Sequence, residues 1–111
     1  PEKDRVRMTD MLTHAREALG FIEGRKRSDL DDLRWLNLSL VRLLEIIGEA
    51  AARVTERTRA EYPEIQWLQI TGLRNRLVHG YNQVDFDIMW NILHDDLPIL
   101  VKHLETAIGD K

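Results

Sequence analysis

The residues best suited to chemistry in this sequence lie together in the segment 72–81, which reads GLRNRLVHGY. They are Arg74, Asn75, Arg76, His79 and Tyr81. An imidazole exchanges protons near neutral pH, and a guanidinium binds phosphate oxygens in a bidentate way. His79 is therefore suited to moving the proton of an RNA 2′-hydroxyl, while Arg74 is suited to stabilising the charge that develops on the attacked phosphate. Together, these two residue types could support cleavage of an RNA phosphodiester without a metal ion.

The spacing of the two candidate catalytic residues does not suit a site on a single ideal helix. Arg74 and His79 would lie roughly 140° apart around an ideal α-helix, so they would not point the same way. Asn75 precedes His79 by one helical turn and is expected to orient its ring, and Arg76 would also be a neighbour. In the last helical turn, the helix dipole would favour the imidazolium. We therefore expect that either the helix end is distorted or a second chain supplies the complementary group.

The same side chains also have interpretations that give them no part in catalysis. His79 would then cap a helix end or fill the core, and Arg74 would pair with Glu45 or Glu49 across the protein. Arg76 would be an accessory phosphate contact or an exposed charge. An ion pair does not exclude catalysis, because a carboxylate can also position an arginine.

Four amphipathic segments must position these side chains, and alternating strand patterns are missing. Apolar residues recur at steps of three and four in each segment, which is typical of helices with one buried face. The predicted helices cover about residues 4–23, 28–54, 64–80 and 85–108. Pro98 lies inside the last one and is expected to kink it, because proline cannot donate to the carbonyl of His94. We expect one all-α domain over residues 1–111, a four-helix up-and-down bundle.

Composition limits the class of protein. The chain has 111 residues, a net charge of −3 and no cysteine, which excludes disulfides and thiolate metal sites. No apolar run is long enough to cross a membrane and no signal peptide is evident, so we expect a cytoplasmic protein. The acidic balance means that nucleic-acid contacts must come from local arginines. Arg53, Arg57 and Arg59 form either a basic rim for RNA or a solvated face.

Other groups have weaker functional interpretations. His94, Asp95, Asp96 and His103 invite a metal site, but no two histidines have ligand spacing on one helix face, so we expect neither metal nor cofactor. The indoles of Trp35, Trp67 and Trp90 are interpreted as core or dimer anchors rather than base-stacking platforms.

The segment also resembles a known family. Arg74, four residues, His79, one residue and Tyr81 match the R-x4-H-x-Y signature of HepT-like toxins in the HEPN superfamily. The resemblance extends over nearly the whole chain, through 47-IGEAA-51, 63-PEI-65, 72-GLRN-75 and 96-DLP-98.

The resemblance implies a metal-independent endoribonuclease that works as a homodimer, with the motifs of two chains in one cleft. It assigns catalysis to Arg74 and His79, with Asn75 as their polar neighbour. It also implies a type VII-like toxin–antitoxin pair, in which a minimal nucleotidyltransferase is the antitoxin and silences the toxin by adenylylating Tyr81.

Two other functions remain open. A non-catalytic module would present substrate or nucleotide to the nucleotidyltransferase partner, and the net acidity favours it slightly. A plain dimeric scaffold would leave the polar cluster at residues 74–81 unexplained.

Overall fold

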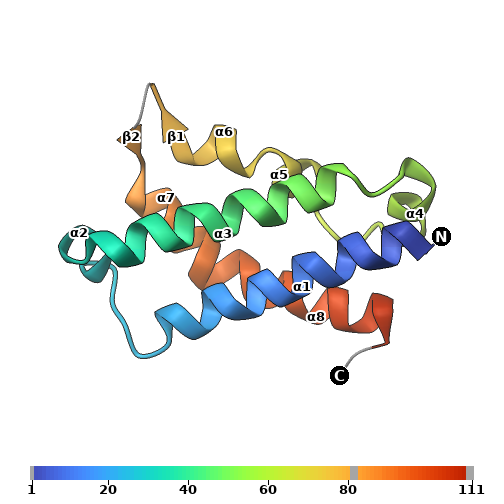
Figure 1. The fold of residues 1–111 in the computed structure, drawn as a ribbon, viewed down its shortest axis with the longest axis horizontal. Helices are drawn as coiled ribbons and strands as arrows, with labels where there is room; N and C mark the ends of the chain where they lie inside the picture. The colour runs from blue at the N-terminus through green and yellow to red at the C-terminus, as the bar shows by residue number, and fades with distance from the viewer. Residues whose placement is uncertain (1, 81–82, 110–111) are drawn as a thin grey trace.

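Three long helices form the frame of the protein, and short elements connect them (Figure 1). The computed structural model describes residues 2–80 and 83–109. The frame consists of α1 (Glu2–Ile22), α3 (Arg34–Ala52) and α8 (Leu97–Ile108). The short elements are α2 (Asp29–Asp32), α4 (Glu56–Glu61), α5 (Trp67–Thr71), α6 (Leu73–Leu77), β1 (Val78–His79), β2 (Gln83–Val84), α7 (Phe86–Asn91) and the π-helical η1 (Ile92–Asp96).

The core lies between the long helices, where the predicted apolar faces meet. α1 and α3 run side by side in opposite directions, and α8 packs along α1 (Figure 1). Almost all the apolar residues that recur at helical spacing in the predicted helices are buried. They include Met8, Leu12, Ala15, Leu36, Leu40, Leu44, Ile47, Leu93, Leu97, Leu100 and Leu104. The prediction of an all-α fold is therefore confirmed, because the apolar faces of the predicted helices are buried against one another.

The boundaries of the helices differ from the predicted ones in three places. The second helix is interrupted at Leu33, whose backbone is extended (φ −115°, ψ 95°). The third helix is divided at Gly72 into α5 and α6, and it stops at Leu77 rather than at Gly80. Residues 78–79 and 83–84 form an antiparallel strand pair that the sequence did not predict.

The last predicted helix changes its hydrogen-bond pattern before Pro98. The π-helical η1 ends at Asp96, and α8 starts at Leu97 with Pro98 in its first turn. A proline is well tolerated there, since the N–H groups of a first turn have no partner inside the helix. The backbone at Leu97 stays right-handed helical (φ −64°, ψ −41°), so the chain continues as one helical segment. A bend of its axis at Pro98 stays a prediction.

A close approach between α3 and α5 fixes the base of the site. A Cβ atom placed on Gly48 would lie 3.1 Å from the carbonyl oxygen of Ile70 and 3.9 Å from Cβ of Leu73. The missing side chain of Gly48 therefore allows α3 and α5 to pack closely. Because α6 follows α5 directly, this contact also sets the position of α6.

A buried carboxylate joins the start of α1 to α4. Asp4 is 3% exposed, and its Oδ2 accepts hydrogen bonds from the hydroxyls of Thr55 (2.6 Å) and Thr58 (2.5 Å). Its Oδ1 accepts the backbone N–H of Thr55 at 3.1 Å. These bonds lower the pKa of Asp4 although burial opposes the shift.

Candidate functional site

The helix α6 carries three of the predicted site residues on a short, well-anchored turn. Leu73 and Leu77 are buried and lie one turn apart, so they fix α6 against the core. Arg74 and Asn75 are exposed between them, and Arg76 is half-buried. The preceding Gly72 is tightly placed, because a Cβ there would lie 3.1 Å from the carbonyl oxygen of Leu68.

His79 lies on strand β1, outside the helix. The pair β1–β2 places Val78 opposite Val84 and His79 opposite Gln83. Gly80 has a positive φ of 77°, which favours glycine directly after the histidine. The expectation that His79 lies in the last helical turn is wrong, and with it the dipole argument. The helix end is distorted, which is one of the two expected alternatives, but the distortion does not join His79 to Arg74. The contribution of a second chain stays a prediction.

The departure from helical geometry changes the neighbours of His79. Asn75 and His79 no longer share a helix face, so the predicted orienting contact is absent: no hydrogen bond joins them within residues 2–80 and 83–109. The Nε2 atom of His79 instead lies 3.8 Å from Oδ2 of Asp85, and the His79 side chain is 58% exposed. The imidazole therefore faces one carboxylate and solvent.

Arg74 forms the ion pair that was predicted as one of two alternatives. Its NH1 lies 2.5 Å from Oε2 of Glu45 on α3, whereas Glu49 has no such contact with it in the described part of the chain. The Arg74 side chain is 68% exposed and that of Glu45 is 21% exposed. The arginine is thus held at one nitrogen, and the rest of its guanidinium is open to a ligand.

The groove beside this ion pair includes Asn75. It runs between α3 and the turn from α5 to α6, and its walls include Gly48, Glu49 and Thr71. Arg74 and Asn75 therefore both line one open groove.

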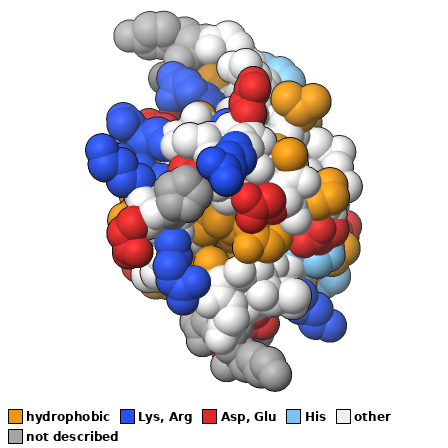
Figure 2. Space-filling model, turned by 90° about the vertical axis from the view of Figure 1, so that its right-hand side faces the viewer, with side chains coloured by type: hydrophobic (Ala, Val, Ile, Leu, Met, Phe, Trp, Pro, Cys, Tyr) orange, Lys and Arg blue, Asp and Glu red, His pale blue; other side chains and the backbone are white. Residues whose placement is uncertain are grey.

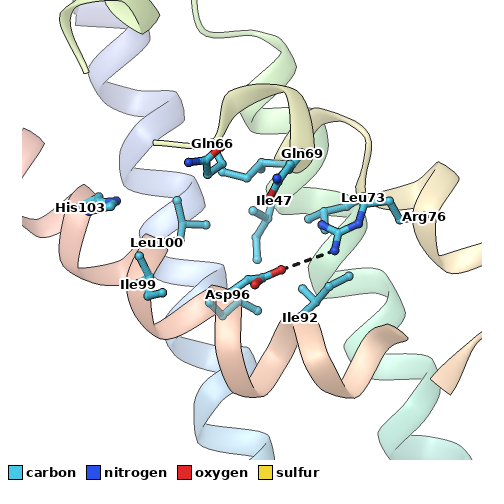
Figure 3. Close-up of a pocket in the computed structure, with 12 residues that line it drawn as sticks. Ile47, Gln66, Gln69, Leu73, Arg76, Ile92, Asp96, Ile99, Leu100 and His103 are labelled. Carbon is cyan, nitrogen blue, oxygen red and sulfur yellow. Dashed lines mark ion pairs between the residues drawn. The ribbon is translucent and has the colours of Figure 1, made fainter. Parts of the chain in front are cut away.

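Arg76 points to the other side of α6, over a small cavity (Figure 3). Its NH2 lies 3.5 Å from Oδ2 of Asp96, which is the last residue of the π-helical segment. The cavity has a volume of about 90 Å³ and an apolar floor of residues such as Ile47 and Leu100. Gln66, Gln69 and His103 contribute polar atoms to its edge. Arg74 and Arg76, two positions apart, thus lie on different surfaces: Arg74 lines the groove beside α3, and Arg76 lines the small cavity.

Tyr81, the predicted modification site, lies outside the described residues. Arg74, Asn75 and Arg76 are brought together on α6, while His79 follows on the hairpin. Across residues 2–80 and 83–109, no hydrogen bond or ion pair joins Arg74 to His79, since each contacts its own carboxylate. One chain does not place these two side chains in contact.

Sequence reasoning missed Asp85 and Asp96 as partners of the motif. Asp85 was assigned only to the start of a helix, and Asp96 only to a weak metal cluster and a family motif. Asp85 does have a local signal, because aspartate directly before a helix is a preferred N-cap. Its second contact, with His79, depends on the strand pairing and has no signal in the sequence.

The predicted cluster around His94 has structural partners. His94 contacts Asp95 at 2.9 Å and stacks on Trp90, with 6.0 Å between ring centroids. Within the residues that the structure describes, no three His, Cys, Asp or Glu side chains are grouped to hold a metal ion.

The three arginines of the predicted basic rim, Arg53, Arg57 and Arg59, do not have the same role. Arg59 donates to the carbonyls of Ala51 and Val54 and thereby caps the end of α3. Arg53 and Arg57 are exposed at the α4 end of the protein, where Figure 2 shows basic and acidic side chains mixed. The hairpin with His79 lies away from this end (Figure 1), so the rim does not extend the motif.

Comparisons with known proteins agree on one family. Residues 11–107 match the family model described as ribonuclease HepT-like. A Methanocaldococcus jannaschii protein named as a candidate RNase is 30% identical over 86% of this chain and 88% of its own length. A Thermococcus cleftensis protein named as a candidate ribonuclease HepT is 36% identical over 56% of each chain.

No solved structure gives a significant match. None of the helices that the structure describes is long and apolar enough to cross a membrane. The family match covers most of the chain and includes the whole segment that carries Arg74 and His79. The chain therefore belongs to the HepT-like ribonuclease family of the HEPN superfamily.

Proposed function

We propose that this chain is a metal-independent endoribonuclease that cleaves RNA through its own 2′-hydroxyl. The observation that carries the proposal is an exposed imidazole close in sequence to an anchored, exposed guanidinium, in a ribonuclease family. His79 takes the proton from the 2′-hydroxyl, and the resulting oxyanion attacks the neighbouring phosphorus. The bond to the 5′ oxygen then breaks, this oxygen takes a proton from water and leaves as a 5′-hydroxyl, and a 2′,3′-cyclic phosphate remains.

Arg74 stabilises the negative charge of the transition state in this scheme. Glu45 holds one of its nitrogens, which leaves further N–H donors for phosphate oxygens. Asn75, on the same open groove, contacts the same phosphate. Arg76 binds a neighbouring phosphate and contributes affinity.

A dimer would complete the site. Arg74 and His79 contact different carboxylates and not each other in the described part of one chain. A second copy would bring the His79 of one chain to the Arg74 of the other. Trp35 and Leu38 on the outer face of α3 support such an interface, because these two large apolar side chains are 50% and 51% exposed and lie one helical turn apart. Glu45 lies on the same helix, which keeps the interface near the motif.

The chain would act as the toxin of a two-gene pair. Its antitoxin would be a minimal nucleotidyltransferase that transfers an adenylyl group to Tyr81. The added phosphate would place negative charge two residues from His79 and would repel an RNA backbone. A cytoplasmic site of action follows from this role.

The second candidate function is a non-catalytic subunit that presents substrate to the nucleotidyltransferase. The net charge of −3 favours it, since a general RNA-binding surface usually carries excess positive charge. Cleavage by the purified chain decides between the two.

The first test is RNA cleavage by the purified chain in EDTA. We expect wild type to cleave and to leave cyclic phosphate ends, and we expect His79→Ala and Arg74→Ala to lose at least about 100-fold in rate, as for loss of a general base or a charge-stabilising donor. His94→Ala is the matched control, because His94 is also an exposed histidine with a carboxylate neighbour. A folded, unmodified dimer that does not cleave RNA would favour the binding subunit.

The second test addresses the partner. Co-expression with the nucleotidyltransferase is expected to add an adenylyl group that mass spectrometry locates on Tyr81. Tyr81→Phe should remain toxic in the presence of the partner. If the partner still neutralises Tyr81→Phe by modifying this chain, Tyr81 is not the regulatory site.

A further inference from the structure

The hairpin brings a carboxylate to His79 from a position six residues later. Strand β1 ends at His79, and strand β2 returns the chain so that the backbone N–H of Asp85 donates to the carbonyl of Leu77 at 2.8 Å. Asp85 therefore sits beside the base of the strand that carries the histidine. Its Oδ2 lies 3.8 Å from Nε2 of His79.

The two oxygens of Asp85 have different partners. Oδ1 accepts the backbone N–H groups of Asp87 and Ile88, both at 3.0 Å, and thereby caps α7. These two bonds fix the plane of the carboxylate. Because Oδ1 is occupied by the helix, Oδ2 is the oxygen that faces the imidazole.

The helix behind Asp85 is itself held in place. Asp87 forms an ion pair with Arg27 at 2.7 Å, and the guanidinium of Arg27 lies 5.9 Å from the ring centroid of Phe86. Asp87 and Asp31 raise the pKa of Arg27, so this cation stays charged. The start of α7 is thus tied to the α2 region, and Asp85 is a fixed rather than a free carboxylate.

We propose that Asp85 is a positioning residue that sets the tautomer of His79. This inference rests on the proposed function, in which His79 moves the proton. A carboxylate oxygen only accepts, so it favours a proton on Nε2, the nitrogen that faces it. Nδ1 is then the unprotonated nitrogen and the one that takes the 2′-hydroxyl proton. Among the described residues, Asp85 supplies the carboxylate that lies within 4.0 Å of this imidazole.

The alternative is that Asp85 only caps α7, and the chemistry of the cap allows a sharp test. Asparagine and serine are about as good at this position as aspartate, so Asp85→Asn and Asp85→Ser keep the helix. In Asp85→Asn, the carbonyl oxygen must still accept from Asp87 and Ile88. The NH₂ group then faces Nε2 of His79, and its partial positive charge disfavours a proton on that nitrogen, so the proton is expected on Nδ1. In Asp85→Ser, no group faces the ring.

The experiment measures the tautomer of His79 and the kinetics of RNA cleavage separately. Nitrogen-15 NMR of the imidazole at a pH where it is neutral is expected to show Nε2–H in wild type, Nδ1–H in Asp85→Asn and a mixture in Asp85→Ser. For RNA cleavage, we expect kcat to fall at least tenfold in Asp85→Asn with KM within twofold, and less in Asp85→Ser. Asp95→Asn is the control, because Asp95 contacts the exposed His94 outside the motif.

The two readouts separate this inference from the proposed function. The same His79 tautomer in wild type and Asp85→Asn would overturn the positioning role, whether or not the protein cleaves RNA. Unchanged kcat in an Asp85→Asn protein whose wild type cleaves would also overturn it. If wild type does not cleave, the proposed nuclease fails, while the NMR result still decides the Asp85–His79 contact.

Discussion

Glu45 on α3 and Arg74 on α6 form an ion pair with 2.5 Å between Oε2 and NH1, across 29 positions of sequence. The carboxylate is mostly shielded and the guanidinium is mostly exposed. The contact joins the motif to α3, whose inner face is buried in the core, so the packing of α3 sets where this arginine can act.

Removing the charge of Glu45 is expected to impair cleavage more than folding. Exposed ion pairs contribute less than about 1 kcal/mol to stability, so Glu45→Gln should unfold within a few degrees of wild type. Because Arg74 loses its charged anchor, single-turnover cleavage should slow by about tenfold, which corresponds to about 1.4 kcal/mol in the barrier. Glu49→Gln is the control on the same helix. Equal rates for the two variants would exclude a positioning role for Glu45.

Arg76 and Arg74 should differ in which kinetic constant they affect. Arg76 already contacts Asp96 and is proposed to bind a neighbouring phosphate, so Arg76→Ala should raise KM several-fold with little change in kcat. Losing one phosphate contact should also reduce the dependence of RNA binding on salt by about one in slope. Arg74→Ala should instead lower kcat. Titrations at several salt concentrations, with steady-state kinetics, check both; a large kcat loss in Arg76→Ala would place this residue in the chemical step.

The close contact at Gly48 predicts opposite effects for two glycine substitutions. Gly48→Ala places a methyl group 3.1 Å from the carbonyl oxygen of Ile70, whose backbone lies in α5 and cannot move freely. We expect a net loss of about 1–2 kcal/mol, because overpacking outweighs the gain in helix propensity. Gly20→Ala, on α1 with nothing within 4 Å, should gain about 0.5–1 kcal/mol. Urea unfolding measures both, and a stabilised Gly48→Ala would show that α5 can shift.

Asp4 makes the stability of the protein depend on pH in the acid range. Hydrogen bonds from Thr55 and Thr58 hold its pKa below the ordinary value of 3.8, so the folded state favours the charged carboxylate. This contribution is complete above the unfolded pKa and is lost as the pH falls through the folded pKa. Asp4→Asn should therefore be less stable than wild type at pH 7, and the difference should shrink below about pH 4.

Urea midpoints for wild type and Asp4→Asn between pH 3 and pH 7 measure this difference. Asp10→Asn, on the same helix, is the control and should show no such convergence. A gap between wild type and Asp4→Asn that stays constant with pH would contradict the role of the two threonines.

Much of the fold follows from local sequence, as α1, α3 and α8 show. Their apolar residues recur with the helical period, and each stripe is buried as predicted. The same reasoning failed at Leu33 and Gly72, where periodicity continues but the helix does not. The spacing of apolar residues indicates which face of a helix is buried. It does not show where a single residue departs from helical backbone dihedral angles and interrupts the helix.

The candidate site divides in the same way. The sequence by itself determined the chemistry of the motif, because the types and order of Arg74, Asn75, Arg76, His79 and Tyr81 are local facts. Only the tertiary structure decided that His79 leaves the helix and faces Asp85, and that Arg74 contacts Glu45 rather than Glu49. The physical reason is that these contacts depend on strand pairing and on the rotation of α6 against α3. Both are set by packing between segments, which no single segment of sequence contains.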